Sequence, residues 1–263
     1  MILDRFDLTD RVAIVTGAGR GIGERAATAL AEIGADVVCA ARSQDQIDAT
    51  AEQIRDGGRR ALAVRTDVMQ RDDIETLVAT TMAEFGRIDV LVNNAGGWPP
   101  SEFLQTSEDD FEEAFRFNVT SAFQMTRLAV PHMAESGGGG SVVNISSRVA
   151  SMAMSGFVAY GTAKAALSFM TRDIAAELSP TVRVNAIEVG AVATSALEYV
   201  KSDEAISRQL EENTPMGRIG DVDDIATMVL YLASPASSWV TGKTYQVDGG
   251  TERAQFDMPR ADL

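Results

Sequence analysis

Residues 12–23 read VAIVTGAGRGIG, and this stretch determines the fold class of the chain. Its first five residues are mostly apolar and β-branched, which favours a buried strand. The glycines that follow let the backbone turn tightly and approach a pyrophosphate, and the helix-forming run after them offers unpaired N–H groups. A strand, a glycine-rich turn and a helix in this order predict a dinucleotide-binding βαβ unit, although the spacing T-G-x-x-x-G-x-G differs from G-x-G-x-x-G.

Strand-like and helix-like runs alternate along the rest of the chain. Strand-like runs lie at 12–16, 36–40, 61–65, 90–93, 141–145, 182–187 and 244–247, and helical patterns lie at 22–33, 45–56, 71–85, 108–134, 157–178 and 221–233. This alternation predicts a three-layer, doubly wound α/β fold, with a seven-stranded parallel sheet and helices on both faces. We expect one domain over residues 1–263, a substrate lid near 191–216 and a C-terminal tail from 251.

Composition restricts the classes of partner. The 263 residues carry a net charge of −15, and an acidic surface repels nucleic-acid backbones and anionic membranes. Cys39 is the only cysteine, so no intrachain disulfide can form, and the N-terminal residues lack the apolar segment of a signal peptide. No apolar stretch approaches the length of a membrane span. We therefore expect a cytoplasmic protein with no nucleic-acid and no membrane partner.

Tyr160 and Lys164 lie four positions apart in a segment that favours a helix. Residues at i and i+4 share a helix face, so the phenol and the ammonium can point into one pocket. A lysine cation stabilises a phenolate, and we expect it to lower the pKa of Tyr160. Tyr160 is then a candidate proton carrier near neutral pH. Because the same spacing arises by chance, this interpretation depends on support from the rest of the chain.

The end of the second strand-like run bears on the choice of cofactor. NAD-binding versions of the motif carry an acidic residue there, whereas this chain reads Ala40-Ala41-Arg42-Ser43. Arg20 in the glycine turn and Arg42 place two guanidinium groups near the expected adenosine ribose, which suits a 2′-phosphate. NADP(H) is therefore favoured, and NAD(H) stays possible because either arginine can instead be a solvated surface residue.

Two other chemistries lack the residues that they need. His132 is the only histidine and has no cysteine beside it, so no metal site is predicted. We expect His132 to be structural or to face solvent. Ser147 has no histidine base at motif spacing, so a serine-hydrolase triad is not supported.

The chain resembles the short-chain dehydrogenase/reductase family, in its short single-domain branch, from about residue 8 to residue 250. The matching motifs are Thr16-Gly17…Gly21…Gly23, Asp67-Val68, Asn93-Asn94-Ala95-Gly96, Asn118, Ser146-Ser147, Tyr160…Lys164 and Val247-Asp248-Gly249-Gly250. The resemblance implies a Rossmann fold, an oxidoreductase and a homotetramer with an interface formed by the helices near 108–134 and 157–178. Apolar residues that can supply this interface, or can belong to the core, are Phe111, Phe115, Phe123, Phe169 and Met170.

The resemblance also implies a role for each matching residue. Tyr160 would be the general acid/base, and Lys164 would bind the nicotinamide ribose and depress the Tyr160 pKa. Ser147, thirteen positions before Tyr160, would hold the substrate oxygen. Asn118 would anchor a water that links Lys164 to solvent, unless it is a polar surface residue of its helix. The implied cofactor-binding set is Gly17, Gly19, Arg20, Gly21, Ile22, Gly23, Arg42, Asp67, Val68, Asn94, Gly96, Tyr160, Lys164, Val192 and Thr194.

One motif departs from the family, and the substrate pocket is defined only in outline. Pro-Gly usually follows the sixth strand, whereas this chain reads Glu188-Val189-Gly190, so the glycine is kept and the proline is lost.

The runs 93–97, 194–197 and 234–240 are similar to bacterial 7α-hydroxysteroid dehydrogenases. We therefore expect the substrate to be a bulky, apolar secondary alcohol or ketone. The expected pocket residues are Ser147 and the mostly apolar Trp98, Met154, Val189, Leu197, Tyr199 and Met216.

Three functions remain open. The leading hypothesis is hydride transfer between NADP(H) and such a small-molecule substrate, with Tyr160 moving the proton. A 3-oxoacyl carrier-protein reductase of the same family would have the same fold and site, and the net charge of −15 argues weakly against docking an acidic carrier. A non-catalytic dinucleotide-sensing protein could use the same fold without chemistry, yet this chain keeps all the residues of the proposed centre.

Overall fold

The computed structural model describes residues 1–194 and 204–254. A seven-stranded, all-parallel sheet runs through it in the order β3-β2-β1-β4-β5-β6-β7. The strands are β1 (Val12–Thr16), β2 (Asp36–Ala41), β3 (Ala61–Arg65), β4 (Val90–Asn93), β5 (Gly140–Ser147), β6 (Val182–Val189) and β7 (Thr244–Val247). The order reverses between β1 and β4, and this reversal opens a crevice at the carboxyl ends of the strands. The predicted doubly wound parallel sheet is confirmed.

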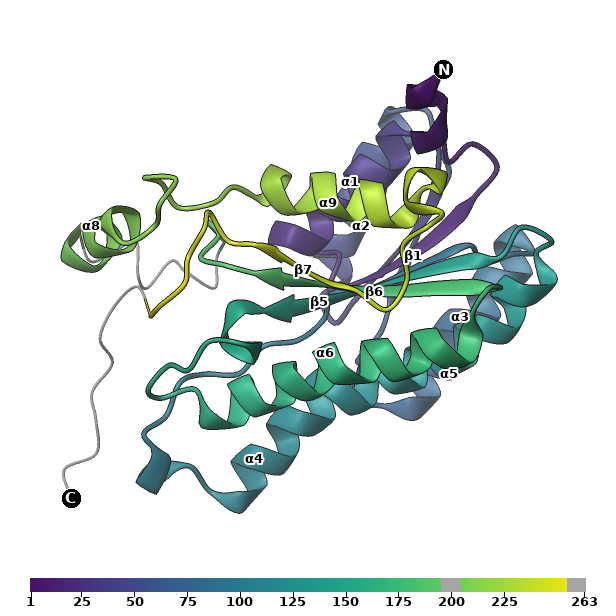
Figure 1. The fold of residues 1–263 in the computed structure, drawn as a ribbon. Coiled ribbons are helices and arrows are strands. Elements are labelled where there is room, and N and C mark those ends of the chain that lie inside the picture. The colour runs from purple at the N-terminus through teal and green to yellow at the C-terminus, as the bar shows by residue number, and fades with distance from the viewer. Residues whose placement is uncertain (195–203, 255–263) are drawn as a thin grey trace.

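Helices cover both faces of this sheet (Figure 1). One face packs against α1 (Gly21–Glu32), α2 (Gln44–Asp56) and α9 (Val222–Ala233). The other face packs against α3 (Arg71–Phe85), α5 (Ser121–Glu135) and α6 (Val158–Leu178). Two further helices lie outside these layers: α4 (Glu108–Phe115), which packs on α6, and α8 (Glu204–Glu212), which lies beyond the carboxyl ends of the strands.

Alternate residues of each central strand enter two separate cores. Ala13 and Val15 of β1 contact the core beneath α1, α2 and α9, whereas Val12 and Ile14 contact the opposite core. All four are buried. A strand that is buried on both faces needs a continuous apolar run, because no position along it faces water. This explains why these strands appear in the sequence as unbroken β-branched runs.

The helix expected at 108–134 is present and runs without a break from Glu108 to Glu135, but it contains a π-helical turn that was not predicted. α4 begins with a capping box, in which the Ser107 hydroxyl accepts a hydrogen bond from the Asp110 N–H. A π-helical turn, Arg116–Thr120, follows α4, and α5 then begins at Ser121. Single π turns inside helices are frequent at functional sites. Apolar periodicity cannot detect one wider turn, and this turn contains the predicted site residue Asn118.

A buried carboxylate holds the amino end of β4. Asp89 accepts hydrogen bonds from Arg11 Nη1 at 2.8 Å, from Arg87 Nη2 at 2.6 Å and from the Val12 N–H at 2.9 Å. Burial raises the pKa of Asp89, but the hydrogen bonds from the two arginines and Val12 outweigh it, so the pKa lies below its usual value. This cluster lies at the opposite end of the strands from the crevice.

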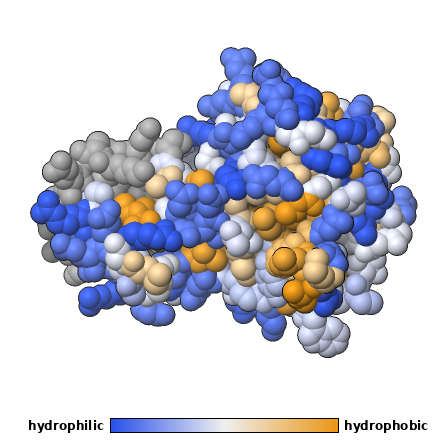
Figure 2. Space-filling model, turned by 90° about the horizontal axis from the view of Figure 1, so that it is seen from above, coloured by the Kyte–Doolittle hydropathy of each residue, from blue (hydrophilic) through white to orange (hydrophobic). Residues whose placement is uncertain are grey.

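The long connection expected to form a lid includes α8. Two of the expected pocket residues, Leu197 and Tyr199, lie outside the described residues, and so does most of the tail. In the part of the chain that is described, no helix is long and apolar enough to cross a membrane. Seen from above, the surface is mostly hydrophilic, with hydrophobic residues confined to limited patches (Figure 2).

Candidate active site

A groove with a volume of about 610 Å³ lies at the carboxyl ends of the strands. Ser147 and Val189 line it, together with every residue of the expected cofactor-binding set. These residues lie at or just after the ends of β1, β2, β3, β4, β5 and β6 and in the first two turns of α1 and α6. The fold therefore brings together in one crevice motifs that are dispersed over almost two hundred positions.

The glycine turn leaves room for a ligand against the backbone. Gly17 and Gly21 adopt left-handed conformations, with φ of 67° and 58°. A Cβ atom on Gly23 would clash with the Gly17 carbonyl oxygen and with Asn94 Nδ2, so only glycine lets α1 begin this close to the turn. The first N–H groups of α1 have no partner within the helix, and they suit an anionic group. These features fit a dinucleotide pyrophosphate.

Asn94 holds the segment after β4 against the glycine turn. Its Nδ2 donates to the Thr16 carbonyl at 2.9 Å and to the Gly17 carbonyl at 3.2 Å. The Thr16 hydroxyl in turn accepts from the backbone N–H groups of Asn94 and Ala95, both at 3.0 Å. Asn94 was expected on the adenosine side of the cofactor, and the structure shows that it also shapes the turn itself.

Two arginines lie at the adenosine end of the groove. Arg20 and Arg42 line the groove and are exposed, and β2 ends without an acidic residue. Over residues 1–194 and 204–254, neither guanidinium forms an ion pair with a carboxylate. Ser43 and Gln46 line the same end, and sequence reasoning missed both. Both could have been predicted to line the groove from their positions, just after Arg42 and within the first turn of α2.

Lys164 and Tyr160 lie on one face of α6, as their spacing predicted. Lys164 is buried and its Nζ donates to the Ile145 carbonyl at 2.8 Å. Burial lowers the pKa of Lys164 to about 7. Nζ lies 5.6 Å from the centroid of the Tyr160 ring.

The expected depression of the Tyr160 pKa was wrong for this structure. Burial raises the pKa of the phenol, and the hydrogen bond donated by the Ser147 hydroxyl lowers it by a smaller amount. Removing the phenol from water disfavours the phenolate, and this effect dominates. Tyr160 therefore stays protonated at neutral pH.

Asn118 is buried, which excludes the alternative that it is a surface residue. Its Oδ1 accepts from the Gly97 N–H at 2.8 Å, and its Nδ2 donates to the Gly97 carbonyl at 3.0 Å and to the Ala114 carbonyl at 2.8 Å. A Cβ atom on Gly96 would lie 2.7 Å from Asn118 Oδ1 and 2.9 Å from Lys164 Nζ. Asn118 and Lys164 thus border the same glycine, and the π turn directs the amide toward it.

The remaining residues expected in the substrate pocket lie in different parts of the structure. Met154 lines a second cavity of about 600 Å³, together with Phe103, Phe157 and other residues of the loop that joins Ser147 to Tyr160. Trp98 is half-buried and belongs to neither set of lining residues in the described part of the chain, and Met216 is exposed. Of the expected substrate residues that the structure describes, Ser147 and Val189 lie in the groove, and Trp98, Met154 and Met216 do not.

The sixth strand extends past its predicted end at 187 and stops at Val189, the residue before Gly190, where the family usually carries proline. β6 continues through Val189, which pairs with Ser147 of β5. The glycine is required because a Cβ atom there would lie 2.6 Å from the Cα atom of Asp248. Beyond it, Val192 forms a bridge to Gly220. A Cβ atom on Gly21 would lie 3.4 Å from Thr194 Cγ2, so the entry to the lid stays beside the glycine turn.

A metal centre finds no support in the described ranges. Residues 1–194 and 204–254 contain no group of three or more histidine, cysteine, aspartate or glutamate side chains that could hold an ion. His132 Nδ1 lies 3.9 Å from Glu135 Oε2 on the same helix. The structural or solvent-facing role of His132 stays a prediction.

The fold and the groove together define a dinucleotide-dependent oxidoreductase of the Rossmann type. A family model described as enoyl-(acyl carrier protein) reductase matches residues 17–252. The chain belongs to the short-chain dehydrogenase/reductase family. It is an NAD(P)-dependent enzyme that acts on CH–OH groups.

Known proteins resemble the chain over nearly its whole length. An uncharacterized oxidoreductase of Mycobacterium tuberculosis is 49% identical over 263 residues, which are 100% of both chains. A solved 7α-hydroxysteroid dehydrogenase, complexed with NADH and 7-oxo glycochenodeoxycholic acid, has a TM-score of 0.92 at 35% identity and covers 97% of this chain and 99% of its own. A gluconate 5-dehydrogenase from Burkholderia cenocepacia, in complex with NADP and tartrate, has a TM-score of 0.90 at 33% identity, with 95% and 98% covered. They confirm the predicted fold and class of enzyme.

Proposed function

We propose that this chain interconverts a bulky, apolar secondary alcohol and its ketone, steroid-like in size, with NADP(H) as cofactor. The observation that carries the proposal is the meeting of Ser147, Tyr160 and Lys164 in a groove that also holds the glycine turn. The bound dinucleotide supplies or accepts the hydride. The protein supplies the proton and the orientation of the substrate.

The side chains divide the proton chemistry among them. The Ser147 hydroxyl holds the substrate oxygen, and Tyr160 gives a proton to that oxygen in reduction and takes one in oxidation. The raised pKa of Tyr160 keeps the phenol protonated at neutral pH, which favours its role as a donor. Lys164, with a pKa of about 7, can gain or lose a proton near neutrality.

The rest of the groove would hold the dinucleotide. The glycine turn and the first turn of α1 suit the pyrophosphate. Asp67 and Val68 line the adenine end, and Val192 and Thr194 line the end where the family binds the nicotinamide. Arg20 and Arg42 suit the 2′-phosphate of NADP(H).

Apolar residues beside Ser147 support an apolar substrate, although the relatives differ in theirs. A 7α-hydroxysteroid dehydrogenase and a gluconate 5-dehydrogenase both resemble the chain closely. Apolar Ile145, Val189 and Phe117 line the groove beside Ser147. Acyl-thioester reduction is the second candidate, because the family model that matches carries an acyl-carrier description.

A screen with paired cofactors tests this proposal. Purified protein is assayed with NADPH and NADH against steroid, aliphatic, sugar-acid and acyl-thioester ketones. We expect turnover with steroid-like ketones and a preference for NADPH. Turnover confined to small charged hydroxy acids would contradict the substrate class, and dinucleotide binding without any turnover would favour the sensing protein.

Arg42→Ala tests the cofactor preference. We expect the KM for NADPH to rise about 10- to 100-fold, because the variant loses charge-assisted hydrogen bonds to the 2′-phosphate. The KM for NADH should stay within about twofold, since NADH lacks that phosphate. Arg71→Ala is the matched control, because Arg71 is an exposed arginine paired with Glu75 away from the groove. An equal rise in both KM values for Arg42→Ala would show that Arg42 does not read the phosphate.

We further propose that the chain assembles as a homotetramer through the outer faces of α4, α5 and α6. The aromatic residues expected there are on the surface: Phe111 is 38%, Phe115 39%, Phe123 43% and Phe169 58% exposed. Light scattering of the wild type at micromolar concentration should give the mass of a tetramer, and Phe169→Asp should shift it to smaller species. A wild-type monomer would contradict the proposal.

We place the protein in the cytoplasm, as a single domain. Cys39 is buried, and burial raises the pKa of its thiol to about 12, so the thiol is unreactive and suits a reducing compartment. Fractionation of cells that express the protein tests this location.

A further inference from the structure

We propose that Glu188 and Arg148 are positioning residues that hold Ser147 and α6 in their working arrangement. This inference rests on the proposed function, because Ser147 is the residue that holds the substrate oxygen. Neither Glu188 nor Arg148 lines the groove, and no motif assigns either of them a role. Both are buried, with 4% and 5% of their surface exposed.

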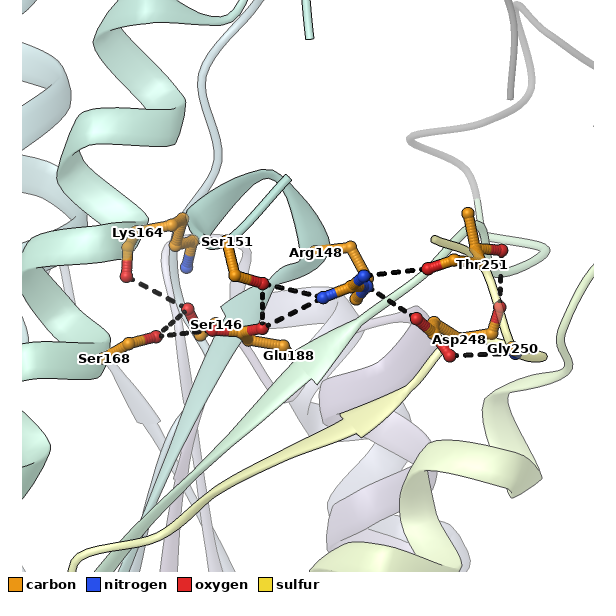
Figure 3. Close-up of polar contacts among 9 residues, drawn as sticks. All are labelled: Ser146, Arg148, Ser151, Lys164, Ser168, Glu188, Asp248, Gly250 and Thr251. Atoms are coloured by element: carbon orange, nitrogen blue, oxygen red, sulfur yellow. Dashed lines mark hydrogen bonds and ion pairs between the residues drawn. The ribbon is translucent and has the colours of Figure 1, made fainter. Parts of the chain in front are cut away.

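The Glu188 carboxylate connects the residues on both sides of Ser147. Its Oε2 accepts from Ser151 Oγ at 2.6 Å and from Arg148 Nη1 at 3.4 Å. Its Oε1 lies 3.3 Å from Ser168 Oγ, which also lies 2.9 Å from Ser146 Oγ, so the single proton of the Ser168 hydroxyl is donated either to the carboxylate or to Ser146 (Figure 3). Ser146 and Arg148 are thus both anchored through one carboxylate, and Ser147 is the residue between them.

The same network reaches the helix that carries the proton-transfer residues. The Ser146 hydroxyl donates to the carbonyl of Lys164 at 3.1 Å. Ser168 lies one turn further along α6 from Lys164. Because Ser146 and Glu188 face each other across β5 and β6, the carboxylate ties the sheet to α6 at the level of Lys164. A shift of Glu188 would therefore move Ser147 relative to Tyr160.

Arg148 extends the network to the segment after β7. Its Nε forms an ion pair with Asp248 Oδ2 at 2.5 Å, and its Nη2 donates to the Thr251 carbonyl at 2.8 Å. The planar guanidinium suits this position, because its five N–H groups can serve several acceptors at once. The segment after β7 also contacts the lid region. Its Gly249 carbonyl accepts a hydrogen bond from the Met216 N–H at 3.1 Å. Arg148 thus links the catalytic strand to the base of the lid.

Stability alone is a weak explanation for such a network. Burying ions removes them from water, and a buried ion pair is often no more stable than apolar residues of similar volume. The network surrounds Ser147, and this placement indicates that it positions the reacting groups accurately. A displacement of about 1 Å in a reacting group can lower the rate about 100-fold. The Asp89 cluster is a suitable comparison, because it is also a buried carboxylate bound by arginines but lies at the amino ends of the strands.

The test compares Glu188→Gln with Asp89→Asn. Each change keeps the shape of the side chain and removes one buried negative charge. For Glu188→Gln we expect kcat to fall about 10- to 100-fold, with the KM for ketone and the Kd for NADPH within about threefold. Amide hydrogen exchange should accelerate in residues 146–151 and 164–168. Asp89→Asn should lower the melting temperature and leave kcat within about twofold, because its site does not touch Ser147.

A milder variant covers the case in which Glu188→Gln does not fold. Ser168→Ala removes one hydrogen bond to the carboxylate and leaves the ion pair, and we expect kcat to fall about 3- to 10-fold. A wild-type kcat in either folded variant overturns the proposal, even if the melting temperature falls. So does an equal loss of kcat in Asp89→Asn. If the wild type turns over no alcohol or ketone, the proposed function fails, and the exchange rates at 146–151 alone decide the positioning role.

Discussion

Tyr160→Phe should lower kcat by about 10³-fold or more and leave NADPH affinity within about threefold. The substitution removes only the phenolic oxygen, which carries the proton to the substrate. The ring keeps its packing, including the tilted contact with Phe157 at 6.3 Å between centroids. Steady-state kinetics and the quenching of protein fluorescence by NADPH measure the two quantities separately.

Tyr245→Phe is the control for this prediction. Tyr245 lies in β7 and is not among the residues that line the groove in the described part of the chain. The substitution removes the same phenolic hydroxyl group as Tyr160→Phe. Its kcat should match the wild type. A Tyr160→Phe variant with wild-type kcat would remove Tyr160 from the mechanism and would favour a different proton donor.

The strands were the most predictable part of the fold. Each predicted run overlaps a strand of the sheet, and for the central strands this follows because double burial requires uninterrupted apolar residues. The end of β6 was less predictable, because Val189 belongs to the strand through its pairing with Ser147 of β5, which no local pattern shows. The π turn at Asn118 was missed, because one additional residue in a turn leaves the apolar periodicity nearly unchanged.

Within the site, the sequence located the residues but not their energetics. The spacing of Tyr160 and Lys164 predicted that they share a helix face, whereas the pKa of Tyr160 depends on how deeply the loop and the sheet bury it. The Arg148–Glu188 pair joins residues forty positions apart, and no local pattern identifies it. Met154 illustrates the same point, since it lines a cavity separate from the groove and no local pattern shows this.

Lys164→Met should abolish most turnover and yet stabilise the protein near pH 6. In the proposed mechanism the variant lacks the ammonium beside Tyr160, and we expect kcat to fall by about 100-fold or more. Stability should change in the opposite direction, because burial lowers the pKa of Lys164 from 10.5 to about 7. At pH 6 the folded wild type holds a buried, unfavourable charge. The methionine variant lacks this charge but also lacks the hydrogen bond to the Ile145 carbonyl. We expect its free energy of unfolding at pH 6 to exceed that of the wild type by an amount on the order of 2 kcal/mol.

The pH dependence distinguishes this effect from ordinary packing. Between pH 7 and 10.5 the folded lysine is neutral while the unfolded lysine is protonated, so unfolding takes up a proton. The free energy of unfolding of the wild type therefore rises with pH in this window, and that of Lys164→Met does not gain this contribution. Denaturant titrations at pH 6, 8 and 10 should show the advantage of the variant shrinking as pH rises. Lys243→Met, at an exposed lysine, should change stability little at any pH. A pH-independent difference for Lys164→Met would show that the buried charge is not its cause.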